Sequence, residues 1–368
     1  MNPLRELNRY GQSVWLDYIS RGLIRGGGLR RLVEDDGLTG VTSNPTLFAK
    51  AIMEGTDYDD AIDEVLRLNP SVSDHVLAER MMVEDVQLAA EVLRPVYDRT
   101  DGADGFVSME VSPASAHDTA ATVAEARRLW FEVARDNVMI KVPATAAGIP
   151  AIEMLIAQGI SVNITLMFSL EHYEAVAHAY LRGLVNHPDP NCVSSVASVF
   201  VSRLDAVADR RLEQIGSADA LALRGKTAIA NARQIYRRFR EIFDGDAFAD
   251  LARRGARLQR PLWASTGTKN PTYSDVLYVE SLIGPDTVTT VPPSTMDAFR
   301  DHGRLRNTLE SADREAELVL QQLAAVGVDV HAITEQLQVD GIEAFATSFD
   351  QLLASLAQKR RLMFTPDV

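Results

Sequence analysis

The sequence predicts an α/β protein built as a single (β/α)8 barrel, the TIM-barrel architecture, with additional helices. Eight short apolar runs, rich in β-branched residues, are separated by stretches with helical periodicity. Alternating strands and helices need crossover connections, which produce a parallel sheet, and eight such units close a barrel. The predicted strands are Val14–Tyr18, Thr39–Asn44, Gly105–Val111, Asn137–Val142, Ile160–Leu166, Val193–Phe200, Pro261–Thr266 and Thr287–Val291.

The segments between these runs have the pattern of amphipathic helices. After the fifth run, Ser169 is a candidate N-cap, and apolar residues from Tyr173 to Leu184 recur along one helical face. At the end of the chain, residues 340–362 predict a C-terminal helix packed on the barrel, so that residues 1–368 form one catalytic domain. The other predicted helices are Asp74–Leu93, Ser115–Arg135, Ile149–Gln158, Ser202–Ile215, Lys226–Phe243 and Arg304–Ala325.

The sequence does not support two other architectures. A chain of 368 residues is long enough for two domains of about 150 residues each, but no linker or internal repeat divides it. An open doubly wound sheet usually carries a glycine-rich phosphate loop after its first strand. The glycines at 26–28 lack the third glycine at the required offset and the lysine of a phosphate loop, so they predict a turn before a short helix.

Composition excludes several classes of function. The net charge is −14, and no long run of basic residues is present, so we expect no nucleic-acid partner. An anionic substrate stays possible if a few cations are concentrated in one cleft. The lone Cys192 cannot form an internal disulfide and belongs to no zinc motif, which favours a reducing cytoplasm and no metal. No uninterrupted apolar stretch of about 18 residues predicts a membrane span.

Polar residues inside the predicted strands are the functional signal. Barrel strands face helices on one side and the packed interior on the other, so both sides are expected to be apolar. Lys141 interrupts the fourth strand, and strand parity places it inside the barrel together with Glu110 of the third. Further inward polar or aromatic candidates near the C-terminal strand ends are Asp17, Thr42, Asn44, Asn163, Thr165, Ser198, Phe200 and Ser265.

These residues could stabilise the barrel interior or could form an active site. Asp17 or Glu110 alone could be the buried partner of a lysine, and Asn163 or Thr165 could be satisfied core residues. Their coincidence at the end where such barrels build active sites favours chemistry. Burial disfavours the charged form of an amine, and a neutral amine attacks carbonyl carbons. We therefore expect a metal-free Schiff-base reaction on a carbonyl compound, with a carboxylate as proton acceptor.

Three motifs resemble those of the transaldolase family, in strand order and over most of the chain. They are GVTSNPT at 40–46, MIKVPAT at 139–145 and GISVNITLMFS at 159–169. The resemblance implies that Lys141 forms the Schiff base with a ketose phosphate and that Asp17 is the acid/base on the hydroxyl at the cleaved bond. It also implies that Glu110 and Thr165 hold a water molecule that relays protons during imine formation and loss.

The resemblance further implies a set of substrate-binding residues. Asn44 and Asn163 would hydrogen-bond the dihydroxyacetone hydroxyls in a pocket that Ser198 also lines, and Thr42 and Phe200 belong to the same predicted set. For the phosphate, the motif after the sixth strand offers Arg203, and Ser265 ends the seventh. Lys269 stands where an arginine is usual, in a loop that is two residues longer than the commoner form.

The expected function is transfer of a dihydroxyacetone unit between sugar phosphates of the pentose phosphate pathway, without a cofactor. A Schiff-base aldolase that releases free dihydroxyacetone is one alternative, and a non-catalytic sugar-phosphate-binding barrel is another. The intact Lys141 argues against the second alternative. Glu110 and Phe200 favour transfer, because an apolar ring near the imine offers no hydroxyl to protonate the carbanion. The oligomeric state, monomer or homodimer, stays open.

Overall fold

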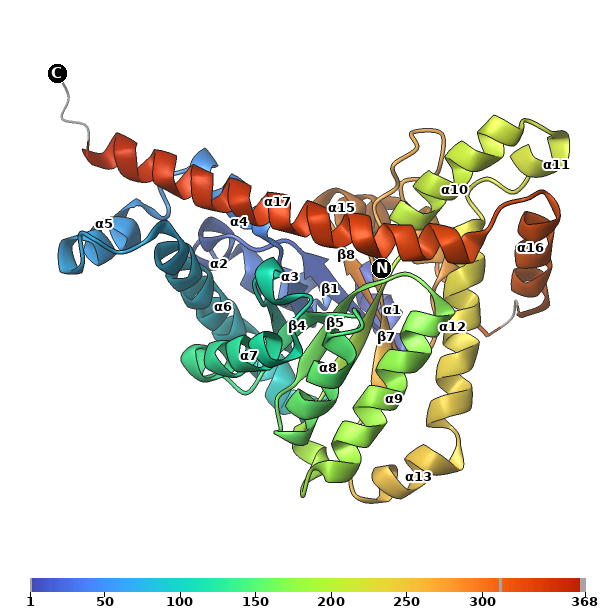
Figure 1. Cartoon of the computed structure of the whole chain (residues 1–368), viewed down its shortest axis with the longest axis horizontal. Coiled ribbons are helices and arrows are strands. Elements are labelled where there is room, and N and C mark those ends of the chain that lie inside the picture. Colours follow the sequence, from blue (N-terminus) through green and yellow to red (C-terminus); the bar gives the residue numbers. More distant parts are fainter. Residues whose placement is uncertain (1, 311–312, 365–368) are drawn as a thin grey trace.

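Eight parallel strands close into one barrel in the computed structural model, which describes residues 2–310 and 313–364 (Figure 1). Each strand pairs with its neighbours in sequence order, and β1 closes the ring by pairing with β8. The predicted (β/α)8 fold is therefore confirmed. The strands are β1 (Gln12–Asp17), β2 (Gly40–Thr42), β3 (Phe106–Glu110), β4 (Val138–Pro143), β5 (Val162–Met167), β6 (Ser195–Phe200), β7 (Gln259–Ala264) and β8 (Thr287–Val291).

Large apolar side chains fill the barrel interior below its C-terminal end. Trp15, Phe106, Met139 and Leu262 come from four different strands and pack with Val288 of a fifth. Each is essentially buried, and such layers of inward side chains make the barrel a packed core rather than a channel. The outward strand residues pack beneath the surrounding helices in a second, larger cluster.

The helices surround the barrel and follow the predicted segments closely in several places. Helix α10 has the predicted bounds, and the Ser169 hydroxyl caps α9 by accepting a hydrogen bond from the His172 N–H at 3.1 Å. The helices are α1 (Pro3–Leu7), α2 (Arg21–Arg25), α3 (Gly28–Asp36), α4 (Pro45–Glu54), α5 (Asp59–Leu68), α6 (Asp74–Arg99), α7 (Thr119–Val133), α8 (Gly148–Ala157), α9 (Leu170–Asn186), α10 (Ser202–Ile215), α11 (Ala218–Leu221), α12 (Thr227–Phe243), α13 (Asp246–Arg253), α14 (Leu277–Ser281), α15 (Pro293–His302), α16 (Asp313–Ala325) and α17 (Val330–Phe364), with 3-10 turns at Asn8–Tyr10, Pro113–Ser115 and Pro190–Cys192.

The predicted helix Arg304–Ala325 is wrong in its first part. Residues 304–308 are not helical, and residues 311–312 lie outside the described part of the chain. The backbone N–H of Arg304 donates to the Glu280 carboxylate at 2.8 Å, and the N–H of Thr308 donates to the Ile283 carbonyl at 2.9 Å. Tertiary hydrogen bonds to α14 and to the residues just after it thus replace the helical ones in this segment.

Two further predicted boundaries also differ. The predicted helix from Ser115 begins at Thr119, because the Asp118 carboxylate caps it by accepting from the Ala121 N–H at 2.9 Å. Helix α6 continues six residues beyond the predicted end at Leu93, despite Pro95 within it. Val96 in this extension is completely buried, so packing sustains the helix where local sequence would end it.

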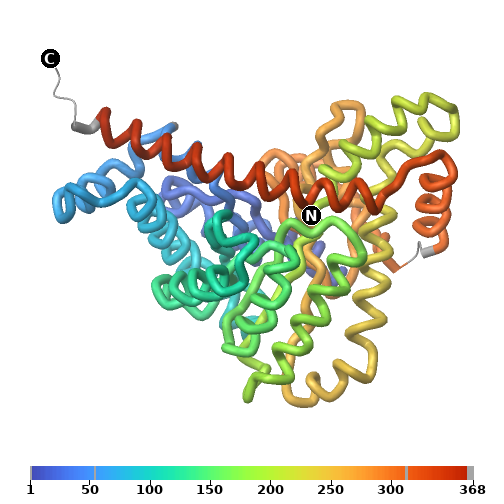
Figure 2. Tube along the Cα trace, viewed as in Figure 1, coloured from blue at the N-terminus to red at the C-terminus, as the bar shows by residue number. Residues whose placement is uncertain are grey.

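Helix α17 begins ten residues before the predicted Asp340 and lies across the barrel mouth (Figures 1 and 2). It contacts α10 near its start, and α4 and α6 farther along. The Gln338 side-chain amide donates to the carbonyl oxygen of Ala144, just after β4, at 2.9 Å. It also donates to the carbonyl oxygen of Leu166, near the end of β5, at 3.1 Å. At the other end, the Lys359 ammonium lies 2.7 Å from the Asp59 carboxylate. The helix is thus attached on both sides of the mouth.

Within the described residues, no single helix is long and apolar enough to cross a membrane. The segments Arg314–Ala325 and Val330–Leu362 meet the length and composition test only as a pair, and this pair is bent by 91°.

Candidate active site

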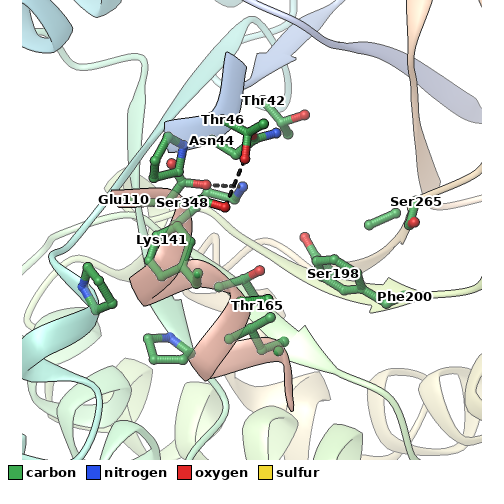
Figure 3. A pocket seen from close by; sticks show the side chains of 18 of the residues that line it. Thr42, Asn44, Thr46, Glu110, Lys141, Thr165, Ser198, Phe200, Ser265 and Ser348 are labelled. Atoms are coloured by element: carbon green, nitrogen blue, oxygen red, sulfur yellow. Dashed lines mark hydrogen bonds and ion pairs between the residues drawn. The ribbon is translucent and has the colours of Figure 1, made fainter. Parts of the chain in front are cut away.

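A cavity of about 330 Å³ opens at the C-terminal end of the barrel, between the strand ends and α17 (Figure 3). All but two of the predicted site residues line it. Those that do are Asp17, Thr42, Asn44, Glu110, Lys141, Thr165, Ser198, Phe200, Arg203 and Ser265.

Lys141 lies at the centre of this cavity because three neighbouring strands are in register there. It is opposite Glu110 of β3 on one side and Asn163 of β5 on the other. Its ammonium nitrogen lies 2.7 Å from Glu110 Oε1 (Figure 3), and it donates to the Ser43 carbonyl at 2.9 Å. Only 8% of Lys141 is exposed, so its amine can be reached chiefly from within the cavity.

Glu110 has an unusual electrostatic environment. Burial raises the pKa of Glu110 to about 7, against the opposing positive charge of Lys141, and the negative charge of Asp17 adds to the rise. Its second oxygen, Oε2, is buried and has no hydrogen-bond partner among the described residues. A carboxyl group with this pKa exists in both protonation states near neutrality, which suits a group that accepts and returns a proton.

Asp17 is held by a threonine pair at the ends of neighbouring strands. The Thr42 hydroxyl donates to Asp17 Oδ1 at 3.0 Å, and it lies 2.8 Å from the hydroxyl of Thr290 in β8. Thr290 lines the cavity and was not among the predicted residues. Strand parity could have found it, because it shares an inward face with Val288 of the barrel interior.

Asn163 lies beneath the cavity rather than in its lining. Its amide nitrogen donates to the Ser108 hydroxyl at 2.9 Å, and its oxygen accepts from the Ser198 hydroxyl at 2.6 Å. All three side chains are buried. In this arrangement Asn163 orients Ser198, which does line the cavity, and direct hydrogen bonding of Asn163 to a substrate stays a prediction.

Arg203 places a cation at the cavity wall, on the first turn of α10. Its guanidinium carbon lies 5.5 Å from the centroid of the Phe200 ring, a cation–π distance. Burial lowers the pKa of Arg203, and the negative charge of Asp17 opposes this shift. The hydroxyl of Ser265, which directly follows β7, lies 2.9 Å from the hydroxyl of Ser202, and Ser265 has a left-handed backbone with φ of 57°.

Lys269 does not line this cavity. It lies with Asp205, Asp209 and Tyr273 along a separate depression beside α10. Lys269 belongs to the loop after β7, whereas Ser265, at the start of the same loop, lines the cavity. The second predicted phosphate-binding cation is therefore not brought together with Arg203.

The sequence did not predict the outer wall of the cavity. Thr46 and Leu47 of α4 line it, and so do residues of α17 that share one helical face. The Thr46 hydroxyl donates to the Ser348 hydroxyl of α17 at 2.9 Å (Figure 3). Helical periodicity predicts that residues around Ser348 form a helix, but it does not show which element this helix covers. The α17 residues in the lining are Gly341, Ile342, Ala344, Phe345 and Ser348.

The described residues contain no group of three or more histidine, cysteine, aspartate or glutamate side chains that could hold a metal ion.

The fold and the site define a (β/α)8 barrel whose pocket is centred on a buried lysine with two carboxylates nearby. The chain belongs to the transaldolase/fructose-6-phosphate aldolase family, whose model matches residues 14–356. It is 47% identical over 363 residues to a transaldolase of Thermobifida fusca (strain YX). The matched residues are 97% of this chain and 98% of that protein. A transaldolase of Thiobacillus denitrificans is 44% identical over 97% of this chain and its own full length. Transaldolase 2 of a Nostoc species is 42% identical over 99% of both chains.

Proposed function

We propose that the protein is a transaldolase of the pentose phosphate pathway, acting in the cytoplasm as a single catalytic domain. It transfers a dihydroxyacetone unit from sedoheptulose 7-phosphate or fructose 6-phosphate to glyceraldehyde 3-phosphate or erythrose 4-phosphate. The observation that carries this proposal is the buried Lys141 amine in the cavity, 2.7 Å from Glu110. Relatives named transaldolase, similar over nearly the whole chain, support it.

The first step is imine formation on Lys141. Its neutral amine attacks the ketone carbon of the donor, and loss of water from the adduct gives an iminium ion. Protons must move from nitrogen to the departing oxygen in this step. Glu110 and Thr165 both line the cavity, and a water molecule held between them would relay these protons. The pKa of Glu110 near 7 suits this role, because the carboxyl group both accepts and donates near neutrality.

The second step is cleavage of the carbon–carbon bond. Asp17 removes the proton from the substrate hydroxyl at the bond to be broken, while the iminium accepts the electron pair from that bond. An aldose phosphate leaves, and a three-carbon enamine stays on Lys141. An acceptor aldehyde then adds to the enamine carbon, Asp17 returns its proton to the new hydroxyl, and water releases the product. Thr42, which donates to Asp17, fixes the orientation of this carboxylate.

Binding of the substrate involves polar groups along the cavity wall. Asn44 and Ser198 line it and are proposed to contact the hydroxyls of the three-carbon unit, with Asn163 supporting Ser198. Arg203 and Ser265 are proposed to bind the phosphate. An arginine can contact two phosphate oxygens at once, and its local charge offsets the −14 net charge of the chain. Lys269 would act on the phosphate only from outside this cavity.

A fructose-6-phosphate aldolase is the second candidate, since the matched family includes that activity. The position of Phe200 favours transfer. Its ring lines the cavity in tilted contact with Phe168, with ring centroids 5.4 Å apart, and offers no hydroxyl that could protonate the enamine.

Borohydride trapping tests the proposal. Incubation with fructose 6-phosphate and borohydride should add a dihydroxyacetone-derived mass to the peptide that contains Lys141, and Lys141→Ala should abolish this adduct. Product analysis with and without erythrose 4-phosphate then separates a transferase from an aldolase. An adduct on another residue, or one that survives Lys141→Ala, would refute the mechanism.

A further inference from the structure

The outer wall of the cavity presents apolar groups between solvent and the proposed enamine on Lys141. Positions 341, 345 and 348 recur at helical spacing and so lie on one face of α17. Phe345 on this face and the neighbouring Ile342 have large apolar side chains, and both line the cavity. They are half-buried, so one side of each contacts solvent and the other closes the cavity.

The backbone of α17 approaches the barrel closely at Gly341. This residue is buried, and a Cβ atom added there would lie 3.0 Å from Cδ2 of Leu166. Leu166 directly follows Thr165, lines the same cavity and has a left-handed backbone with φ of 54°. Because Gln338 also donates to the Leu166 carbonyl, α17 is fixed against the strand that carries Thr165.

Both ends of α17 are fixed, so its apolar face does not depend on one contact. Near its start, the His172 ring lies 2.8 Å from the Glu335 carboxylate. Near its end, Arg360 donates to the Val72 carbonyl at 2.9 Å and contacts the Asp74 carboxylate at 3.2 Å. The Thr46–Ser348 hydrogen bond joins the middle of the helix to α4 (Figure 3).

We propose that Ile342 and Phe345 exclude water from the enamine on Lys141 and so determine whether the three-carbon unit is transferred or released. This inference rests on the proposed function. Closing a site against water suppresses the hydrolysis of reactive intermediates. Here the apolar face of α17 supplies the closure from the solvent side, while Phe200 supplies an apolar surface from the barrel side.

The side reaction that this closure prevents consumes one water molecule. A proton from solvent adds to the nucleophilic carbon of the enamine, which gives the iminium of dihydroxyacetone. Water then adds to the iminium carbon, the carbon–nitrogen bond breaks, and the products are free dihydroxyacetone and the Lys141 amine. In productive transfer, the same carbon instead forms a bond to the acceptor aldehyde. The ratio of dihydroxyacetone released to product transferred therefore measures the access of water.

Phe345→Ala and Ile342→Ala test the inference, with Val339→Ala as the matched control. Val339 is an apolar residue of the same helix, 51% exposed and outside the cavity lining. Each enzyme receives fructose 6-phosphate with and without erythrose 4-phosphate, and dihydroxyacetone and sedoheptulose 7-phosphate are quantified. We expect the release-to-transfer ratio to rise about tenfold in each cavity variant, equivalent to about 1.4 kcal/mol between the two barriers. Val339→Ala should keep the wild-type ratio, and Phe345→Leu should restore most of it.

Borohydride trapping of every variant separates the two possible failures. Absence of the Lys141 adduct in the wild type refutes the proposed function itself. If the adduct forms but both cavity variants keep the wild-type ratio, or lose transfer and release equally, water exclusion by α17 is refuted. Should Phe345→Ala fail to fold, Ile342→Ala still decides the outcome: a ratio about tenfold above that of Val339→Ala supports the water barrier, and a ratio equal to that of Val339→Ala refutes it.

Discussion

The barrel contains a buried carboxylate beside a cation at each end, and the two carboxylates differ in how completely they are hydrogen-bonded. At the N-terminal end, Asp104 Oδ1 accepts from the Trp15 indole N–H at 2.8 Å and from the Gly105 N–H at 3.1 Å. Its Oδ2 accepts from the Ser13 hydroxyl and lies 3.5 Å from the Arg260 guanidinium. At the C-terminal end, Glu110 contacts Lys141 through one oxygen, and the other has no partner among the described residues.

This difference distinguishes a pair that stabilises the fold from a pair that can take part in a reaction. A buried polar network with every group hydrogen-bonded contributes rigidity and leaves no group available for a ligand. An incompletely satisfied carboxylate that faces a cavity retains the capacity to bind water or move a proton. Charge and burial alone do not separate the two ends, because both pairs combine an acid with a cation inside the same barrel. The comparison yields four predictions.

The largest effect is expected for Asp17→Ala at the C-terminal end. Removing the proposed acid/base should lower the transfer rate by a factor of ~10²–10⁴, because bond cleavage loses its proton acceptor. The variant should still fold and still give the borohydride adduct on Lys141 with fructose 6-phosphate. Steady-state transfer assays and thermal unfolding check this. A strongly reduced melting temperature with normal activity in the folded fraction would place Asp17 with the structural pair instead.

Asp104→Ala at the N-terminal end should show the reverse pattern. Loss of this carboxylate leaves the buried Trp15 N–H without its acceptor and removes the negative charge beside Arg260, so the free energy of unfolding should fall by about 3 kcal/mol. The rate per folded molecule should stay near that of the wild type. Asp104→Asn, which keeps an acceptor oxygen, should lose less stability. Denaturant titration with parallel activity assays measures both quantities, and a selective loss of activity would contradict the structural assignment.

Arg203→Ala should raise the KM for fructose 6-phosphate by roughly 10- to 150-fold, since a charge-assisted hydrogen bond contributes ~1.5–3 kcal/mol. Unphosphorylated fructose should be nearly unaffected. Lys269→Ala is the matched control, and its effect should be much smaller because Lys269 lies along the neighbouring depression. Kinetics with both substrates check the prediction. Equal losses with fructose and fructose 6-phosphate would show that Arg203 does not bind the phosphate.

Most of the residues at the C-terminal end of the barrel could be predicted from the sequence. Strand parity located Lys141, Glu110 and Thr165 inside the barrel because a closed sheet has a strict two-residue alternation and no exposed edge. The same local rule located Asp17 and Ser198 at the C-terminal end. Predicting the positions of these residues required only the strand assignment and the resemblance of their motifs to a known family. Their presence in one cavity was therefore predictable.

The features that escaped prediction depend on contacts distant in sequence. The family resemblance predicts Lys269 as a second phosphate-binding cation beside Arg203, but Lys269 lines the neighbouring depression and not the cavity. Phe345 belongs to a predicted helix, yet its position in the cavity depends on attachments at Gln338 and Lys359 to other elements. Helical periodicity shows which residues share a face and gives no information on what that face covers.

The smallest and most specific effect concerns pH. Glu110 has a pKa raised to about 7, so it is protonated below that pH and cannot accept a proton during imine formation. We therefore expect kcat/KM to fall by about tenfold per pH unit below about 7.

A raised pKa also means that the contribution of protonated Glu110 to stability is present at low pH and is lost as the pH rises from 4.5 towards 7. Glu110→Gln should have low activity without this acidic limb and should lose this pH dependence of unfolding. A pH–rate profile of the variant that retains the limb would assign the titration to another group.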